Sequence, residues 1–163
     1  MTMTQPLRVL CVEDSPADAE LVRHELRRAG FDVQWRLVQT EPDFLAALES
    51  DLDIILSDYH MPDFCGLRAL QLLRERGRDI PFIIISGAVG EDVATAAMRM
   101  GAVDYLLKDR LGRLGAAVAN AMEVHRLRQS ERRVTQQMRL QAATMEAAAN
   151  GICITDRQEP SFM

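Results

Sequence analysis

Four apolar stretches of this chain each end in polar side chains that could take part in phosphoryl transfer. The polar groups are three carboxylates, a hydroxyl and an ammonium: Glu13 and Asp14 after residues 8–12, Asp58 after residues 53–57, Ser86 after residues 81–85, and Lys108 after residues 103–107. Short apolar runs of this kind are typical of strands buried on both faces of a parallel sheet. Ligands of such sheets bind at the carboxyl edge, so we expect these groups to converge there.

These groups suit a carboxylate that accepts a phosphoryl group beside a metal ion. Mg²⁺ prefers oxygen ligands in octahedral geometry, and one to three carboxylates, a carbonyl and waters can supply them. An ammonium at the phosphoryl oxygens neutralises further negative charge, and a hydroxyl donates a hydrogen bond to them. The chain holds all of these parts, so a metal-assisted phosphoryl-accepting site is predicted.

The elements that must position these groups follow an alternation of strand and helix, repeated five times. Strands are predicted at residues 7–12, 31–37, 53–57, 81–85 and 103–107, and a helix is predicted after each of them. Ser15 and Thr40 are predicted helix N-caps, because each precedes a proline and an aspartate in the first turn. Repeated βα units imply right-handed crossovers and a parallel sheet with helices on both faces.

The chain then continues without proline from about Leu114 to Pro160. Apolar residues at positions 124, 127, 134, 138 and 145 fall on alternating three- and four-residue steps if positions 131 and 141 fill the gaps. This imperfect heptad predicts a long helix to about Ala149 that joins two chains in a parallel homodimer. We expect a break at Asn150-Gly151 and a new strand over residues 152–156.

Composition narrows the classes of function. A length of 163 residues fits one domain with an appendage. A net charge of −5 argues against nucleic acid as a partner of this segment, and no helix-turn-helix pattern follows the βα units. Cys11, Cys65 and Cys153 are widely spaced and favour a reducing cytoplasm. No apolar stretch reaches transmembrane length and residues 1–6 do not resemble a signal peptide, so we expect a cytoplasmic location and no membrane partner.

The motifs together resemble the receiver domain of two-component response regulators. The resemblance covers residues 7–121 and rests on the order and spacing of Glu13-Asp14, Asp58 followed by Met61-Pro62, Ser86-Gly87, and Tyr105-Leu106-Leu107-Lys108. It implies a doubly wound, five-stranded fold of flavodoxin type with strand order 2-1-3-4-5. It also implies that a histidine kinase or a histidine phosphotransfer protein donates a phosphoryl group to Asp58.

The same resemblance implies a ligand set for Mg²⁺. Glu13, Asp14 and Asp58 would hold the ion, and the backbone carbonyl of His60 would complete the protein ligands. Lys108 would contact Asp58 or its phosphoryl group.

The resemblance further implies a switch next to this site. Ser86 would bond a phosphoryl oxygen after transfer, and Tyr105 would then change rotamer toward the space that Ser86 vacates. The side chains of His60 and Ala88 border the phosphoryl position and are expected to tune dephosphorylation.

A weaker resemblance concerns the end of the chain. Residues 146–156 look like the entry to a PAS sensor domain, with a signalling helix, a break and a first strand. The predicted organisation is therefore an N-terminal tail (1–6), a receiver domain (7–121), a signalling helix (122–149) and the start of a truncated PAS domain (150–163). Any output enzyme would lie beyond this segment.

Three alternatives stay open from the residues alone. A phosphohydrolase of the haloacid dehalogenase type also forms an aspartyl phosphate, but it needs a second aspartate where His60 stands. A receiver fold that binds partners without phosphate would not need Lys108 and the acidic pair. His125 could be a kinase phosphoacceptor, but Arg126 follows it where an acid is usual. We therefore expect a phosphoacceptor switch rather than an enzyme, with self-phosphorylation and self-dephosphorylation as its own chemistry.

Overall fold

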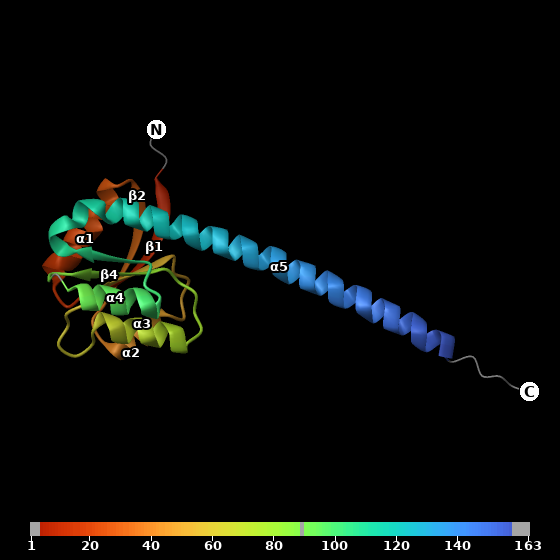
Figure 1. Cartoon of the computed structure of the whole chain (residues 1–163). Helices are drawn as coiled ribbons and strands as arrows, with labels where there is room; N and C mark the ends of the chain where they lie inside the picture. Colours follow the sequence, from red (N-terminus) through yellow and green to blue (C-terminus); the bar gives the residue numbers. More distant parts are fainter. Residues whose placement is uncertain (1–3, 89, 158–163) are drawn as a thin grey trace, which may run out of the picture. The chain divides into compact units, whose positions relative to one another are not determined.

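A computed structural model describes residues 4–88 and 90–157 of the chain. In this part, five strands alternate with five α-helices, and a short 3₁₀-helix precedes the last α-helix (Figure 1). The strands are β1 (Gln5–Val12), β2 (Phe31–Val38), β3 (Ile54–Asp58), β4 (Phe82–Ser86) and β5 (Asp104–Leu107). The helices are α1 (Pro16–Arg28), α2 (Glu41–Ala47), α3 (Gly66–Glu75), α4 (Glu91–Met100), η1 (Lys108–Arg113) and α5 (Leu114–Arg157).

The strands form one parallel sheet in the order β2-β1-β3-β4-β5. The predicted fold class and strand order are thereby confirmed. The register pairs Asp58 with Ile85 and Ser86 with Leu107, so the carboxyl ends of β3, β4 and β5 lie level with one another. This common edge is where the polar residues of the sequence were expected to meet.

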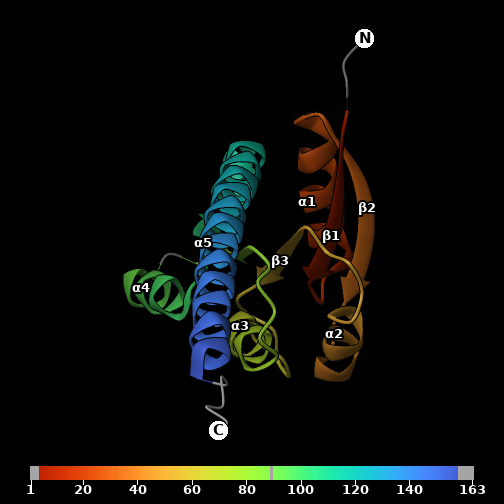
Figure 2. The ribbon, with the colours of Figure 1, turned by 90° about the vertical axis from the view of Figure 1, so that its right-hand side faces the viewer.

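Two buried apolar clusters cover the two faces of the sheet. One cluster packs β-strand side chains such as Ile83 against Leu26 of α1 and Val118 of α5. The other packs strand side chains such as Ile84 against α2, α3 and α4, with Phe44 fully buried. Figures 1 and 2 show the corresponding layers, with α1 and the first turns of α5 on one side of the sheet and α2, α3 and α4 on the other. Consecutive strand residues point to opposite faces, and both faces are covered at β3 and β4, which explains why these two strands are buried along their whole length.

Local chemistry explains where two helices begin. The hydroxyl of Ser15 accepts a hydrogen bond from the backbone N–H of Asp18 at 3.3 Å, and the hydroxyl of Thr40 accepts one from the N–H of Asp43 at 3.3 Å. Each bond satisfies one of the free N–H groups of the first turn. Both predicted N-caps are confirmed, and the cap of α1 fixes the turn of chain that follows β1.

The end of the chain differs from the prediction. Helix α5 runs from Leu114 to Arg157 without interruption, so the break expected at Asn150-Gly151 and the strand expected over residues 152–156 are wrong. A glycine inside a helix costs only about 1 kcal/mol relative to alanine. A helix pairs its own backbone groups, whereas a lone strand needs a neighbouring strand to pair them. The β-branched residues after Gly151 therefore continue the helix.

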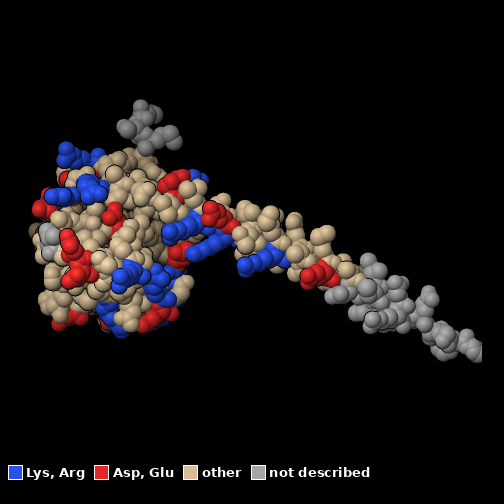
Figure 3. Space-filling model, in the orientation of Figure 1, with Lys and Arg blue, Asp and Glu red and all other residues tan. Residues whose placement is uncertain are grey.

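The chain divides into two compact units, residues 1–125 and residues 126–163. On the face of the first unit seen in Figure 3, acidic and basic side chains are interspersed. The described part of the second unit is the remainder of α5. Five large apolar side chains on it are at least half exposed: Leu127, Val134, Met138, Leu140 and Met145.

Within the residues that the structure describes, no helix combines the length and the apolar character needed to cross a bilayer.

Candidate functional site

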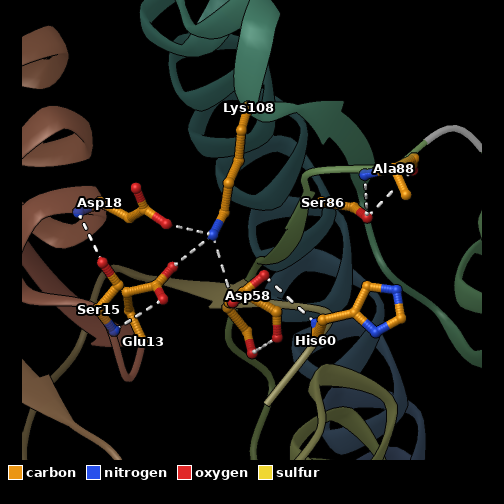
Figure 4. Close-up of polar contacts among 9 residues, drawn as sticks. Glu13, Ser15, Asp18, Asp58, His60, Ser86, Ala88 and Lys108 are labelled. Atoms are coloured by element: carbon orange, nitrogen blue, oxygen red, sulfur yellow. Dashed lines mark hydrogen bonds and ion pairs between the residues drawn. The ribbon is translucent and has the colours of Figure 1, made fainter.

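The site lies at the carboxyl edge of the sheet, where four strands deliver one polar group or pair each. Glu13 directly follows β1, Asp58 and Ser86 are the last residues of β3 and β4, and Lys108 directly follows β5. Figure 4 shows the side chain of Lys108 reaching from the end of β5 towards Glu13 and Asp58. The structure therefore brings together the residues that the sequence placed at this edge.

Three carboxylates form the acidic part of the site. Glu13, Asp14 and Asp58 each offer an oxygen, and these oxygens all lie within 4.8 Å of one another. Glu13 and Asp58 are only 3% and 5% exposed, while Asp14 faces solvent. Buried charges at this separation repel one another unless cations compensate them.

Lys108 supplies the positive charge. Its Nζ lies 3.2 Å from Oε2 of Glu13 and 3.3 Å from Oδ2 of Asp58. A third and shorter contact, 2.7 Å, joins the same Nζ to Oδ2 of Asp18 in the first turn of α1. Burial alone would lower the pKa of Lys108, but the hydrogen bond to Asp18 and the charges of Glu13 and Asp58 raise it above its ordinary value. The ammonium therefore stays protonated at neutral pH.

Asp18 is the site residue that sequence reasoning missed. The sequence pattern marks Asp18 only as the aspartate in the first turn after the N-cap Ser15. The available signal was the order of elements, because the helix after β1 begins at the same edge of the sheet at which β1 ends. A carboxylate in that first turn is therefore within reach of the site.

The fold strongly changes the acidity of Glu13. Burial raises its pKa to about 7, and the charge of Asp58 adds to this effect, although the backbone N–H of Ser15 and the ammonium of Lys108 oppose it. The N–H of Ser15 donates to Oε1 of Glu13 at 3.0 Å. The residue that caps α1 therefore also orients Glu13.

The end of β3 is held by its own loop. The backbone N–H of His60 donates to Oδ1 of Asp58 at 3.3 Å, and the rings of Tyr59 and His60 meet edge to face with centroids 4.7 Å apart. Gly66 at the start of α3 lies against this backbone, since a Cβ added there would come within 2.8 Å of the carbonyl oxygen of Asp58. The N–H of His60 thus orients the side chain of Asp58, and Gly66 allows α3 to approach the backbone of Asp58 closely.

The hydroxyls of the expected switch meet at a backbone group. The hydroxyl of Ser86 donates to the carbonyl of Ala88 at 3.1 Å and accepts from the N–H of Ala88 at 3.3 Å. The hydroxyl of Tyr105 donates to the same carbonyl at 3.1 Å. In Figure 4 the Ser86 hydroxyl is turned towards Ala88. Ser86, Ala88 and Tyr105 are therefore linked through a single carbonyl oxygen.

The acidic oxygens fit a hard divalent cation. Mg²⁺ takes oxygen ligands and keeps several waters, and the solvent-facing side chain of Asp14 leaves the cluster open to water on one side. Glu13, Asp14 and Asp58 are the residues that would hold it.

Comparison with known proteins agrees with this geometry. The sequence model of the family described as "response regulator receiver domain" matches residues 9–119. The luminescence regulatory protein LuxO of Vibrio campbellii is 34% identical over 113 residues, which span 68% of this chain and 24% of that protein. The chain thus matches about a quarter of the length of that relative.

Solved structures give the same result for the fold. The structure titled FixJ-N is 30% identical, with a TM-score of 0.64 over 74% of this chain and 96% of that one. A response regulator receiver domain protein from Clostridium thermocellum is 22% identical, with a TM-score of 0.66 over 74% of this chain and 98% of that one. Because the family model matches residues 9–119, which is more than half of the sequence, the chain belongs to the response regulator receiver domain family.

Proposed function

We propose that this receiver domain accepts a phosphoryl group on Asp58 from the phosphohistidine of a histidine kinase or a histidine phosphotransfer protein. The observation that carries the proposal is the ammonium of Lys108, which lies within 3.3 Å of both Glu13 and Asp58 at the edge of the sheet. A buried aspartate beside a fixed cation can hold the extra negative charge of a phosphoryl group.

The transfer is a displacement at phosphorus. A carboxylate oxygen of Asp58 attacks the phosphorus, a new O–P bond forms, and the N–P bond of the phosphohistidine breaks. The imidazole leaves with the bonding electron pair and takes up a proton. Glu13, Asp14, Asp58 and the backbone carbonyl of His60 would hold Mg²⁺, which would supply positive charge at the phosphoryl oxygens. Lys108 neutralises the remaining charge, and the N–H of His60 orients the attacking carboxylate.

The switch follows from the shared carbonyl of Ala88. Once phosphorylated, Asp58 presents strong acceptor oxygens, and the hydroxyl of Ser86 turns from the carbonyl of Ala88 towards them. The hydroxyl of Tyr105 donates to that same carbonyl, so its rotamer responds to the movement of the Ser86 loop. The side chains of His60 and Ala88 border the phosphoryl position and set the access of the water that hydrolyses it.

The test is labelling with acetyl phosphate followed by intact mass, with and without Mg²⁺. We expect one phosphoryl adduct on the native chain, none without Mg²⁺, and none in Asp58→Asn. Asp53→Asn is a matched control, because Asp53 directly precedes β3, at the end of the strand opposite to Asp58, and forms an ion pair with Arg8. Labelling of the native chain and of Asp58→Asn to the same extent would refute the assignment. A native chain that is never labelled would favour a receiver fold that binds partners without phosphate.

The long helix carries the signal onward in this proposal. Residues 122–149 belong to a signalling helix that dimerises in parallel through its heptad and leads to an output, such as a PAS domain that follows the end of α5 at Arg157. Support comes from the apolar side chains of the heptad, which are at least half exposed at Leu127, Val134, Met138 and Met145. Exposed apolar residues at this spacing gain stability when a second helix covers them.

Sedimentation velocity of the native chain and two matched variants tests the dimer. Met138 lies on the heptad and Leu140 lies off it, although the two side chains are similarly exposed, at 66% and 61%. We expect Met138→Asp to shift the native dimer to monomer and Leu140→Asp to leave it a dimer. A native chain that stays monomeric with and without Mg²⁺ and beryllium fluoride would refute the dimer.

A further inference from the structure

Asp18 has no role in the function proposed above, although it makes the shortest contact of Lys108. We propose that Asp18 is a positioning residue, which holds the Lys108 ammonium beside the acidic cluster so that a divalent cation can bind there. This inference rests on the proposed function, because it concerns the same site.

Lys108 and a divalent cation would share two carboxylate groups. In the structure the ammonium contacts Glu13 at 3.2 Å and Asp58 at 3.3 Å, and these are two of the three carboxylates that could hold a metal ion. Two positive charges on the same two carboxylates repel one another. Lys108 must therefore move off them, at least in part, when the cluster takes a cation.

Asp18 offers a position to which Lys108 can move. Its Oδ2 accepts from Nζ of Lys108 at 2.7 Å, the shortest of the three distances. Asp18 is not among the carboxylates that gather within 4.8 Å, so its bond to Lys108 does not use a cation ligand. Figure 4 shows Asp18 on the far side of the ammonium from Asp58. A small rotation of the lysine side chain towards Asp18 would release Asp58 without leaving the ammonium unpaired.

Hydrogen bonds at the N-terminal cap of α1 hold the backbone of Asp18 in place. The backbone N–H of Asp18 donates to the hydroxyl of Ser15, and the N–H of Ser15 donates to Glu13. The cap of α1 therefore connects Asp18 to a cation ligand through one residue. The side chain of Asp18 is 37% exposed, whereas that of Glu13 is 4% exposed, so Asp18 lies at the rim of the site.

The experiment measures binding of Mn²⁺ to the full chain by the electron paramagnetic resonance of the free ion. Four proteins form a double-mutant cycle: native, Asp18→Asn, Lys108→Met and the double variant. Asp43→Asn is the matched control, because Asp43 occupies the same place in the first turn of α2 and its N–H donates to Thr40 in the same way. Circular dichroism of each protein shows that it is folded.

We expect Asp18→Asn to weaken Mn²⁺ binding about fivefold in the native background, which lies within the range of couplings between residues in contact. In the Lys108→Met background the same substitution should change the affinity by less than about twofold, because there is no ammonium left to position. Asp43→Asn should bind Mn²⁺ like the native chain. This pattern assigns the effect of Asp18 to Lys108 rather than to helix stability.

Two results would overturn the inference. An equal loss of Mn²⁺ affinity in both backgrounds would mean that Asp18 acts only as a negative charge near the cation. An unchanged or tighter affinity in Asp18→Asn would show that Asp18 does not position Lys108 for cation binding. In either case the native chain still binds Mn²⁺, so the proposed function stands. A native chain that binds no Mn²⁺ would instead refute the cation site of the proposed function, and the role of Asp18 with it.

Discussion

Substitution of Gly66 by alanine tests how closely α3 must approach the acidic strand. A Cβ at this position would lie 2.8 Å from the carbonyl oxygen of Asp58, 3.3 Å from Oγ of Ser57 and 3.3 Å from Cα of Tyr59. Two of these three atoms belong to the backbone, which cannot rotate away as a flexible side chain could. The positive-φ glycines of the described chain are at positions 30, 77 and 101, so the expected effect at Gly66 is steric and not a matter of φ.

The magnitude follows from two opposing contributions. Forcing an extra methyl group into a packed site costs about 1–3 kcal/mol. Replacing glycine by alanine within a helix returns up to about 1 kcal/mol, because alanine loses less backbone freedom on folding. We expect a net loss of about 1–2 kcal/mol in the free energy of unfolding. With a urea dependence of about 2 kcal/mol per molar, the unfolding midpoint falls by about 0.5–1 M.

The assay is urea unfolding of Gly66→Ala beside the native chain and Gly112→Ala. Gly112 is the matched control, because a Cβ there would meet no atom within 4 Å. Phosphorylation by acetyl phosphate should also slow in Gly66→Ala, because the displaced carbonyl belongs to Asp58. An unfolding midpoint equal to that of the native chain, or an equal fall in Gly112→Ala, would show that the close approach of α3 does not limit stability.

Two further predictions concern acidity and packing. Burial gives Glu13 a folded pKa of about 7, above its ordinary 4.5, so the folded chain holds this proton more tightly than the unfolded chain does. In metal-free buffer the free energy of unfolding should therefore fall as pH rises from about 4.5 to about 7. The free energy of Glu13→Gln, measured by urea unfolding, should lack this fall. The same pH dependence in both proteins would contradict the assignment of the pH effect to Glu13. Phe44 is fully buried, and the centroid of its ring lies 5.4 Å from that of Phe64. Phe44→Ala should therefore lower the free energy of unfolding, measured in urea, by about 3–5 kcal/mol. A loss below about 1 kcal/mol would mean that neighbouring side chains move in to fill the cavity.

The fold and the edge that carries the site could be predicted from the sequence because two independent patterns agree. Continuous aliphatic runs mark strands that are covered on both faces, and the residue at the end of each run falls at the same edge of a parallel sheet. This reasoning placed Asp58, Ser86 and Lys108 correctly relative to the strands. The N-caps Ser15 and Thr40 were equally predictable, since a cap depends only on a few neighbouring residues.

Side-chain partners and the last helix could not be predicted in the same way. The bond between Lys108 and Asp18 joins residues 90 positions apart, and it depends on where α1 begins relative to β5. The choice of Ala88 as the partner of Ser86 depends on a rotamer, which sequence patterns do not encode. The strand predicted over residues 152–156 followed intrinsic β propensity, which is weak compared with the need of every strand for a paired neighbour.

The long separation between Lys108 and its carboxylates has a consequence during synthesis of the protein on the ribosome. Glu13 and Asp58 precede Lys108 in the sequence, so a nascent chain that ends before β5 carries both acids without the ammonium that compensates them in the complete domain. Such a chain lacks both the edge strand and the ammonium. Translation of residues 104–108 thus supplies the last strand of the sheet and the compensating charge of the site together.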